Sequence, residues 1–354
     1  MTQTHQPAVL PKQPRVLSAW YVACHSSELG AEPVSTVIWE RPLVVWRGSS
    51  GELGCLLDRC PHRNVPLSDG RVVGDRIQCG YHGWTLAAEG QVTAVPGLSP
   101  GSALPGKCAT SYPIRESQGM IWVWLNPDVE PTHEPFSFPY ADDATYTTVR
   151  RELFAKGSLH QMIENALDVP HTAFLHGGLF RNDGERTGIE VQVRRWHDRC
   201  EAEYIGEARP DGWAGWLLSP SGGDVTHFDR FYLPSIIEVE YRIGTENHIV
   251  LSAACTPVSD FETKMHAVVS LKTRFPGWLV KLLVQPIALR IFGQDARMLD
   301  LQTEAIRRFG SERFTSTEID LLGPHIMALL KRAERGKVVE TDAAPFEKTV
   351  TLMV

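Results

Sequence analysis

The sequence predicts an α+β protein, in which a small antiparallel β domain precedes a larger domain with an antiparallel sheet and long C-terminal helices. Three observations lead to this prediction. The chain has 354 residues, enough for two domains and a sizeable core. Its first third consists of short β-rich runs separated by Gly, Pro and Asp turns, and its last third shows long helical periodicity. Between them lie further strand-like runs, which predict one twisted antiparallel sheet.

The first domain is expected at residues 15–127, after a flexible tail at 1–14. Several short strands with turns at close intervals are typical of a small antiparallel β domain. The strand candidates are residues 20–24, 34–39, 43–46, 55–57, 76–78 and 120–125. Residues 128–145, rich in Pro, Asp and aromatic side chains, are expected to be a linker.

The second domain is expected at residues 146–337, followed by a C-terminal tail at 338–354. It begins with a strand at 146–153 and a helix at 159–167. A long helical pattern from Pro276 to Phe309 should break at Pro286 and Gly293. A final helix is expected at 316–335, with Thr315 or Ser316 as N-cap and Gly336 as terminator. The strand candidates between these helices are 189–196, 201–207, 225–233, 236–243, 248–256 and 266–273.

Composition excludes several classes of protein. The net charge of −7 argues against broad nucleic-acid binding, which needs a basic face. Seven scattered cysteines do not form a disulfide framework, so a cytoplasmic location is expected. No run of 18 apolar residues occurs, so no membrane span is expected. The most apolar stretch, residues 278–292, contains Lys281, Gln285, Pro286 and Arg290, which favours a buried helix over a lid or a membrane-touching surface.

Two short loops carry the first cluster of metal-binding residue types. Cys60-Pro-His62 and Cys79-Gly-Tyr-His82 each offer one thiolate and one imidazole. Two such mixed loops facing each other can give both cysteines to one metal and both histidines to another, the ligation of a Rieske [2Fe–2S] centre. The alternative is a Cys₂His₂ zinc site, although zinc sites usually pair Cys with Cys and His with His.

A second cluster lies at residues 164–176, which read Glu-Asn-Ala-Leu-Asp-Val-Pro-His-Thr-Ala-Phe-Leu-His. His171 and His176 follow a predicted helix and can both point inward if the segment unwinds at Pro170. Mononuclear Fe(II) oxygenases use two histidines and one carboxylate on one face of the metal. Alone this pattern is weak, because such a histidine pair is often structural. Asp168, three residues before a histidine, could hydrogen-bond to its ring.

Together the two clusters resemble the Rieske non-haem iron oxygenases. Arg63, Tyr81 and Trp84 look like the residues that flank the cluster motif, and residues 165–176 resemble the family's Asn-x-x-Asp-x-x-His-x₄-His signature. The resemblance implies a helix-grip, START-like catalytic domain. It also implies one [2Fe–2S] cluster held by Cys60, His62, Cys79 and His82, and one Fe²⁺ held by His171, His176 and a distant carboxylate.

The distant carboxylate is expected on a helix after the last strands. Asp295, in Phe-Gly-Gln-Asp at 292–295, fits this position, and Asp300 and Glu304 are the rival candidates. The resemblance gives Asp168 the role of linking His171 to a cluster histidine, His82, of a neighbouring subunit. Such a path implies an oligomer, expected to be a homotrimer.

The resemblance further implies a terminal oxygenase that uses O₂ and needs a separate NAD(P)H-dependent reductase, with or without a ferredoxin. The chain has no dinucleotide-binding or flavin fingerprint of its own. The chain is short for a ring dihydroxylase, and its motif reads Asp-Val-Pro-His where ring dihydroxylases have Asp-x-Tyr-His. Both features favour the vanillate-demethylase-type branch and mono-oxygenation, by hydroxylation or oxidative demethylation. Ring cis-dihydroxylation or desaturation is the alternative, and a Rieske electron-transfer protein without oxygenase activity is an alternative of another class.

The expected substrate is hydrophobic, and polycyclic or steroid-like compounds are candidates for it. Apolar and aromatic side chains with few charges among them predict a roomy pocket for an uncharged or weakly polar molecule. The candidate lining residues outside 278–292 are Trp213, Trp216, Leu217, Phe228, Phe231 and Tyr232.

Overall fold

The computed structural model describes residues 12–176, 188–206, 225–244, 247–273, 275–337 and 344–353, without the side chains of residues 283 and 284. The chain divides into two compact units. Residues 16–137 form one unit, and residues 138–354 with the segment before residue 16 form the other. The α+β class predicted from the sequence is confirmed.

The first unit is built from ten short strands in three antiparallel sheets. The sheet orders are β1-β10-β9, β2-β3-β4 and β5-β6-β7-β8. The predicted strands are present, and the two- to four-residue strands β5, β7, β8 and β9 were not predicted because so short a run gives no pattern. The bounds are β1 Trp20–His25, β2 Val34–Ile38, β3 Arg41–Arg47, β4 Leu53–Leu57, β5 Arg71–Val73, β6 Arg76–Gln78, β7 Thr85–Leu86, β8 Val92–Ala94, β9 Ile114–Ser117 and β10 Met120–Trp124, with a 3₁₀ turn, η1, at Ser26–Glu28.

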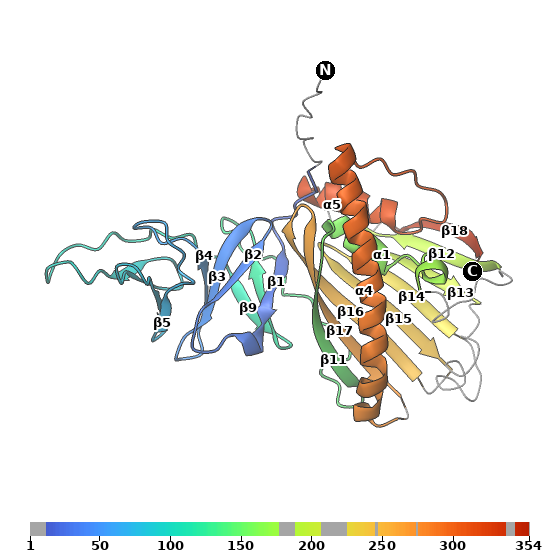
Figure 1. Cartoon of the computed structure of the whole chain (residues 1–354), viewed down its shortest axis with the longest axis horizontal. Helices are drawn as coiled ribbons and strands as arrows, with labels where there is room; N and C mark the ends of the chain where they lie inside the picture. The colour runs from blue at the N-terminus through green and yellow to red at the C-terminus, as the bar shows by residue number, and fades with distance from the viewer. Residues whose placement is uncertain are drawn as a thin grey trace, which may run out of the picture. The chain divides into compact units, whose positions relative to one another are not determined.

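The second unit contains one eight-stranded antiparallel sheet in the order β11-β17-β16-β15-β14-β13-β12-β18. Helices lie across one face of this sheet (Figure 1). The strands are β11 Thr147–Ala155, β12 Gly188–Arg195, β13 Arg199–Ile205, β14 Val225–Tyr232, β15 Ile236–Ile243, β16 Asn247–Ser259, β17 Glu262–Lys272 and β18 Phe346–Met353; the helices are α1 Leu159–Ala166, α2 Thr172–Leu175, α4 Gly277–Phe309 and α5 Gly323–Glu334. The helix-grip arrangement expected for the catalytic domain is therefore present.

Helix α4 runs without interruption through 33 residues, so the predicted breaks at Pro286 and Gly293 are wrong. Proline and glycine lower helix stability by local rules, but tertiary packing overrides local propensity. The C-terminal half of α4 is fixed by Leu299, which is buried, and by Thr303, whose hydroxyl donates to the carbonyl of Lys156 at 3.1 Å. The helix ends at Gly310, which has φ of 69° and is suited to the left-handed cap position.

The N-terminal half of α4 was expected to be buried, and this expectation is also wrong. Val280 is buried, but the large apolar side chains on the other faces are exposed in this chain. An exposed apolar surface of this kind is typical of an interaction site. Its most exposed members are Trp278, Leu282, Ile287 and Leu289.

Helix α5 begins at Gly323, seven residues after the predicted start, so Thr315 and Ser316 are not its N-cap. Pro324 stands in the first turn of the helix, where its missing N–H costs nothing. A Cβ atom at position 323 would collide with the carboxylate of Glu164, so the Glu164 side chain would have to move if α5 carried a larger residue here. Gly336 adopts φ of 63° directly after the helix, as predicted for its terminator.

The C-terminal segment is not a loose tail. Residues 346–353 form strand β18, which pairs with β12 from Gly188↔Met353 to Arg195↔Phe346. Only Val350 and Leu352 are buried, so the alternating pattern was too short to detect. At the other end, residues 1–11 of the expected tail lie outside the described part, whereas Gln13 is buried and donates to Glu312 at 3.1 Å.

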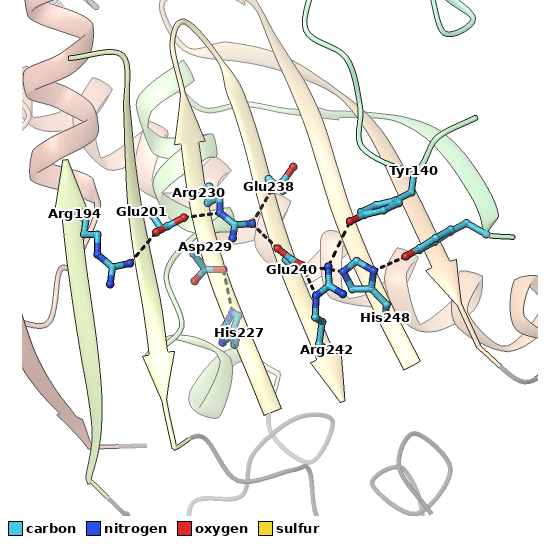
Figure 2. A network of polar contacts seen from close by, with 11 residues as sticks. Tyr140, Arg194, Glu201, His227, Asp229, Arg230, Glu238, Glu240, Arg242 and His248 are labelled. Atoms are coloured by element: carbon cyan, nitrogen blue, oxygen red, sulfur yellow. Dashed lines mark hydrogen bonds and ion pairs between the residues drawn. The ribbon is translucent and has the colours of Figure 1, made fainter. Parts of the chain in front are cut away.

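Four adjacent strands carry a row of alternating charges on the face of the sheet opposite the helices (Figure 2). Arg194, Glu201, Arg230 and Glu238 are register partners across β12, β13, β14 and β15. Arg230 is the centre of the row, because it contacts Glu201 at 2.6 Å and Glu238 at 2.8 Å. The next residue after Arg194, Arg195, points to the other face, where it lies 3.2 Å from His325 of α5. Opposite charges on facing positions stabilise the sheet and fix its register.

Candidate functional site: two metal centres

The Rieske-type loops have the same backbone geometry. Cys60 N–H donates to the carbonyl of Val65 at 2.8 Å, and Cys79 N–H donates to the carbonyl of Trp84 at 2.8 Å. Four residues after each cysteine, Asn64 and Gly83 adopt positive φ values of 63° and 72°. Each loop therefore turns tightly around its sulfur, and both turns need a residue that tolerates the left-handed conformation.

The two thiols are buried and close together. Cys60 and Cys79 belong to an apolar core cluster. Burial raises the pKa of the Cys60 thiol, and the neighbouring Cys79 raises it further, whereas the backbone amides of His62 and Arg63 lower it because they donate to the sulfur. Amide donors around paired sulfurs are the environment that tunes an iron–sulfur cluster.

The two imidazoles lie beside each other at the outer end of the loops. The ring centroids of His62 and His82 are 4.6 Å apart, and His62 stacks on Trp84 at 4.7 Å. Nδ1 of His62 is buried and has no hydrogen-bond partner among the described residues. A buried lone pair without a partner is unfavourable unless it binds something, so the paired thiols and imidazoles fit a [2Fe–2S] cluster.

The second centre is built around the short helix α2. Helix α1 begins at a capping box, in which Ser158 and Gln161 exchange hydrogen bonds, and it ends at Ala166. His171 then precedes α2 and His176 follows it. The predicted unwinding between the helices is present, and it places both histidines on one side.

The three predicted ligands of the second centre converge. Nε2 of His171 and Nε2 of His176 are 3.3 Å apart, and Oδ1 of Asp295 lies 3.1 Å from Nε2 of His176 and 3.5 Å from Nε2 of His171. Neighbouring ligands about 2.1 Å from a metal, at about 90° to each other, are about 3 Å apart. The buried Oδ1 of Asp295 accepts no hydrogen bond from the described residues. These atoms therefore fit one face of a divalent cation such as Fe(II).

Of the rival carboxylates, Asp300 lies 3.6 Å from the amine of Lys156, and Glu304 is exposed. Neither belongs to the group of converging atoms.

Each histidine of the second centre has an oxygen atom at its other nitrogen. Asp168 Oδ2 lies 3.2 Å from Nδ1 of His171 and also accepts the backbone N–H of that residue at 3.3 Å. Gln294 Oε1 lies 3.0 Å from Nδ1 of His176. Burial would lower the pKa of His171, but the neighbouring carboxylates of Asp168 and Asp295 raise this pKa to about 9. The site therefore favours positive charge.

Three polar groups near these helices and the sheet were not identified from the sequence. Gln294 was quoted only as the neighbour of Asp295, and its contact with His176 spans 118 positions. Burial raises the pKa of Glu164 to about 7, and Asp168 and Asp320 add to this rise. The third is a buried pair on β14, in which Nε2 of His227 lies 3.1 Å from Asp229.

Two family models match the chain, one in each unit. Residues 19–113 match the Rieske [2Fe-2S] domain, and residues 156–335 match the vanillate O-demethylase oxygenase C-terminal domain. A Rieske domain followed by this oxygenase domain defines the class of protein. The chain belongs to the Rieske non-haem iron oxygenase family, as the resemblance predicted.

Individual relatives agree with this assignment. The vanillate O-demethylase oxygenase subunit of Pseudomonas sp. strain HR199 is 26% identical over 358 residues, covering 92% of this chain and 97% of the relative. The chloroplastic protein TIC 55 of Arabidopsis thaliana is 28% identical over 292 residues, covering 78% of this chain; the chain spans about half of its length, 51%. The crystal structure of dicamba monooxygenase bound to 3,6-dichlorosalicylic acid shares the fold, with a TM-score of 0.78, 22% identity, and coverage of 92% of this chain and 100% of the other.

Some predicted features lie outside this description. Trp213, Trp216 and Leu217, expected to line a substrate pocket, are not among the described residues. The other three candidate pocket residues lie on β14. Phe231 is buried on one face of the sheet, and Phe228 and Tyr232 point to the opposite face. In the described part of the chain, no helix has both the length and the hydrophobicity that a membrane crossing requires.

Proposed function

We propose that the chain is the terminal oxygenase of a Rieske system, and that it mono-oxygenates a hydrophobic substrate. The observation that supports this most strongly is the convergence of His171, His176 and Asp295 in a chain that also carries complete Rieske loops. A protein that only carries electrons would have no need to keep an unpaired buried carboxylate oxygen beside two imidazoles. When bound, the cluster supplies single electrons and the Fe²⁺ supplies a site for O₂ activation.

In this proposal the chain's own residues hold the two centres. Cys60 and Cys79 would hold one iron of the cluster, and His62 and His82 would hold the other. His171, His176 and Asp295 would hold the mononuclear iron, which would supply the site for O₂ activation. Asp168 keeps the proton of His171 on Nδ1, so that Nε2 remains a metal donor.

We further propose that Asp168 connects His171 to His82 of a neighbouring subunit in a homotrimer. His82 is exposed, and the Asp168 side chain is 32% exposed while it contacts His171. A path between subunits needs accessible groups at both of its ends. The exposed apolar surface of α4, which includes Trp278 and Leu282, supports association with other subunits.

The electron donor in this proposal is a separate NAD(P)H-dependent reductase, with or without a ferredoxin. The proposed location is the cytoplasm, because none of the seven cysteines forms a disulfide. The proposed substrate is hydrophobic, in keeping with the apolar residues on the helix-covered face of the sheet, such as Val191, Phe231 and Ala253.

Turnover with ¹⁸O₂ tests the proposed reaction. The protein loaded with both metals is supplied with a reductase and NADH, and it is offered polycyclic compounds, methyl ethers and small aromatic acids. The proposal predicts one labelled oxygen per hydroxylated product, or one formaldehyde per demethylated product. Two labelled oxygens would establish ring dihydroxylation instead, and turnover of small aromatic acids alone would contradict the hydrophobic substrate. Reduction of the cluster without substrate-dependent O₂ uptake on any compound would favour an electron carrier.

A further inference from the structure

Helix α4 holds the ring of His176 from both sides. Gln294 Oε1 lies 3.0 Å from Nδ1, and the next residue, Asp295, places Oδ1 3.1 Å from Nε2. The His176 side chain is 2% exposed, so neither ring nitrogen depends on bulk water. Two successive residues of one helix therefore face both nitrogens of one imidazole.

The orientation of the Gln294 amide decides which nitrogen of His176 carries the proton. With the amide oxygen at Nδ1, that nitrogen must be the donor, and Nε2 keeps its lone pair. With the amide turned round, its NH₂ group would donate to Nδ1, and the proton would move to Nε2. Nε2–H would then donate to Asp295, and the ring would be closed to a metal.

We propose that Gln294 is a positioning residue that keeps His176 in the Nδ1–H form and thereby keeps its Nε2 available to the mononuclear iron. The inference rests on the proposed iron site. His171 has a charged acceptor, Asp168, at the same atom, whereas His176 has a neutral one. The neutral amide orients the ring without adding a second negative charge next to Asp295. Partners of this kind typically change metal affinity by about 10- to 100-fold.

Metal titration tests this inference without turnover. The mononuclear iron is removed with a chelator while the cluster is kept, and Co²⁺ is added anaerobically while its binding is followed by calorimetry and by the visible spectrum of the bound ion. Gln294→Leu keeps the size of the side chain but removes the acceptor, and we expect it to bind Co²⁺ about 10- to 100-fold more weakly. Gln294→Glu restores an acceptor, and we expect it to bind at least as tightly as the unaltered protein.

The matched control is Gln302→Leu, because Gln302 lies on the same helix and makes no hydrogen bond to either histidine in the described structure. We expect this variant to bind Co²⁺ as the unaltered protein does. Full affinity in Gln294→Leu would overturn the inference, and so would equal losses in both leucine variants, since the helix and not the amide would then be responsible. If the unaltered protein bound no Co²⁺, the proposed iron site itself would be contradicted before any variant was compared.

Discussion

Nε2 of His176 lies 3.1 Å from Oδ1 of Asp295, although the two residues belong to distant parts of the sequence. Both atoms are buried, and Oδ1 accepts no hydrogen bond within the described structure. Two electron-rich atoms this close are stable when a cation or a proton lies between them. The arrangement therefore favours Asp295 over Asp300 and Glu304 as the carboxylate of the proposed iron site.

Asp295→Asn should remove the mononuclear iron and leave the cluster intact. The amide is a weaker metal donor, and its NH₂ group would oppose a cation. We expect the protein to lose one of about three irons per chain, to keep its visible spectrum and to lose all oxygenase activity. Asp300→Asn, further along α4, is the control and should keep its iron, because Asp300 lies beside Lys156. Loss of iron in the control alone would transfer the ligand role to Asp300.

Cys60→Ser should abolish the cluster. The buried thiol stands among amide donors, and serine cannot replace the thiolate that binds the cluster iron. We expect no Rieske spectrum and loss of acid-labile sulfide. Cys108→Ser is the matched control, since Cys108 is exposed and outside the two loops. A colourless unaltered protein with one zinc per chain would show instead that the four residues form a zinc site.

Asp168→Asn should keep both metals and stop multiple turnover. The amide oxygen of the new side chain could still accept from His171, so iron content should be retained within about twofold. What is lost is the negative charge of the proposed connection to His82 of the next subunit. We expect a single substrate-dependent turnover after chemical reduction and a steady-state rate at least about 10-fold lower. Full steady-state activity would show that Asp168 has no part in electron transfer.

Arg230→Ala should destabilise the sheet by about 3 kcal/mol at pH 7, because it leaves Glu201, Glu238 and Glu240 without their shared partner. Thermal unfolding measures the loss, which should shrink at lower pH as Glu238 takes up a proton, because burial raises the pKa of this carboxyl. Arg242→Ala removes an exposed side chain of β15 that contacts Glu240 at 2.9 Å, and this change should cost less than about 1 kcal/mol. Equal losses of stability in the two variants would show that the burial of Arg230 adds nothing to the stability that its ion pairs provide.

Glu164→Gln should change how stability depends on pH. The pKa of Glu164 rises from 4.5 to about 7 in the folded protein, because burial disfavours the charged form. A raised carboxyl pKa means that stability falls as pH increases between these two values and stays lower above them. The side chain is 33% exposed, so solvent screening limits the effect to about 1 to 2 kcal/mol. We expect the variant to be more stable than the unaltered protein at pH 8 and equally stable at pH 4. Glu304→Gln, a change of an exposed residue, is the control, and equal effects of the two changes would contradict this prediction.

The sequence allowed the local parts of the sites to be predicted, and the contacts between distant segments were harder to predict. Two short loops contain Cys60, His62, Cys79 and His82, and one turn of helix separates His171 from His176. Their spacing in the sequence was therefore enough to identify them as candidate ligands. Gln294 could not be identified in this way, because its contact with His176 depends on how α4 packs over α2.

The errors in the fold have the same origin. Pro286 and Gly293 predict breaks by local propensity, but the packing of Leu299 and Thr303 helps to keep α4 in one piece. Strand β18 has only two buried positions and needs β12, which lies far earlier in the chain, to define its register. Neither result could be read from a short window of sequence.

The measurement that tests the central claim most directly is the iron, zinc and acid-labile sulfide content per chain, together with the electron-spin spectrum of the reduced protein. The account predicts about three irons and two sulfides per chain and the spectrum of a Rieske cluster. Two irons and two sulfides, with no uptake of added Fe²⁺, would contradict the oxygenase site. Zinc in place of iron, with no sulfide, would contradict both centres.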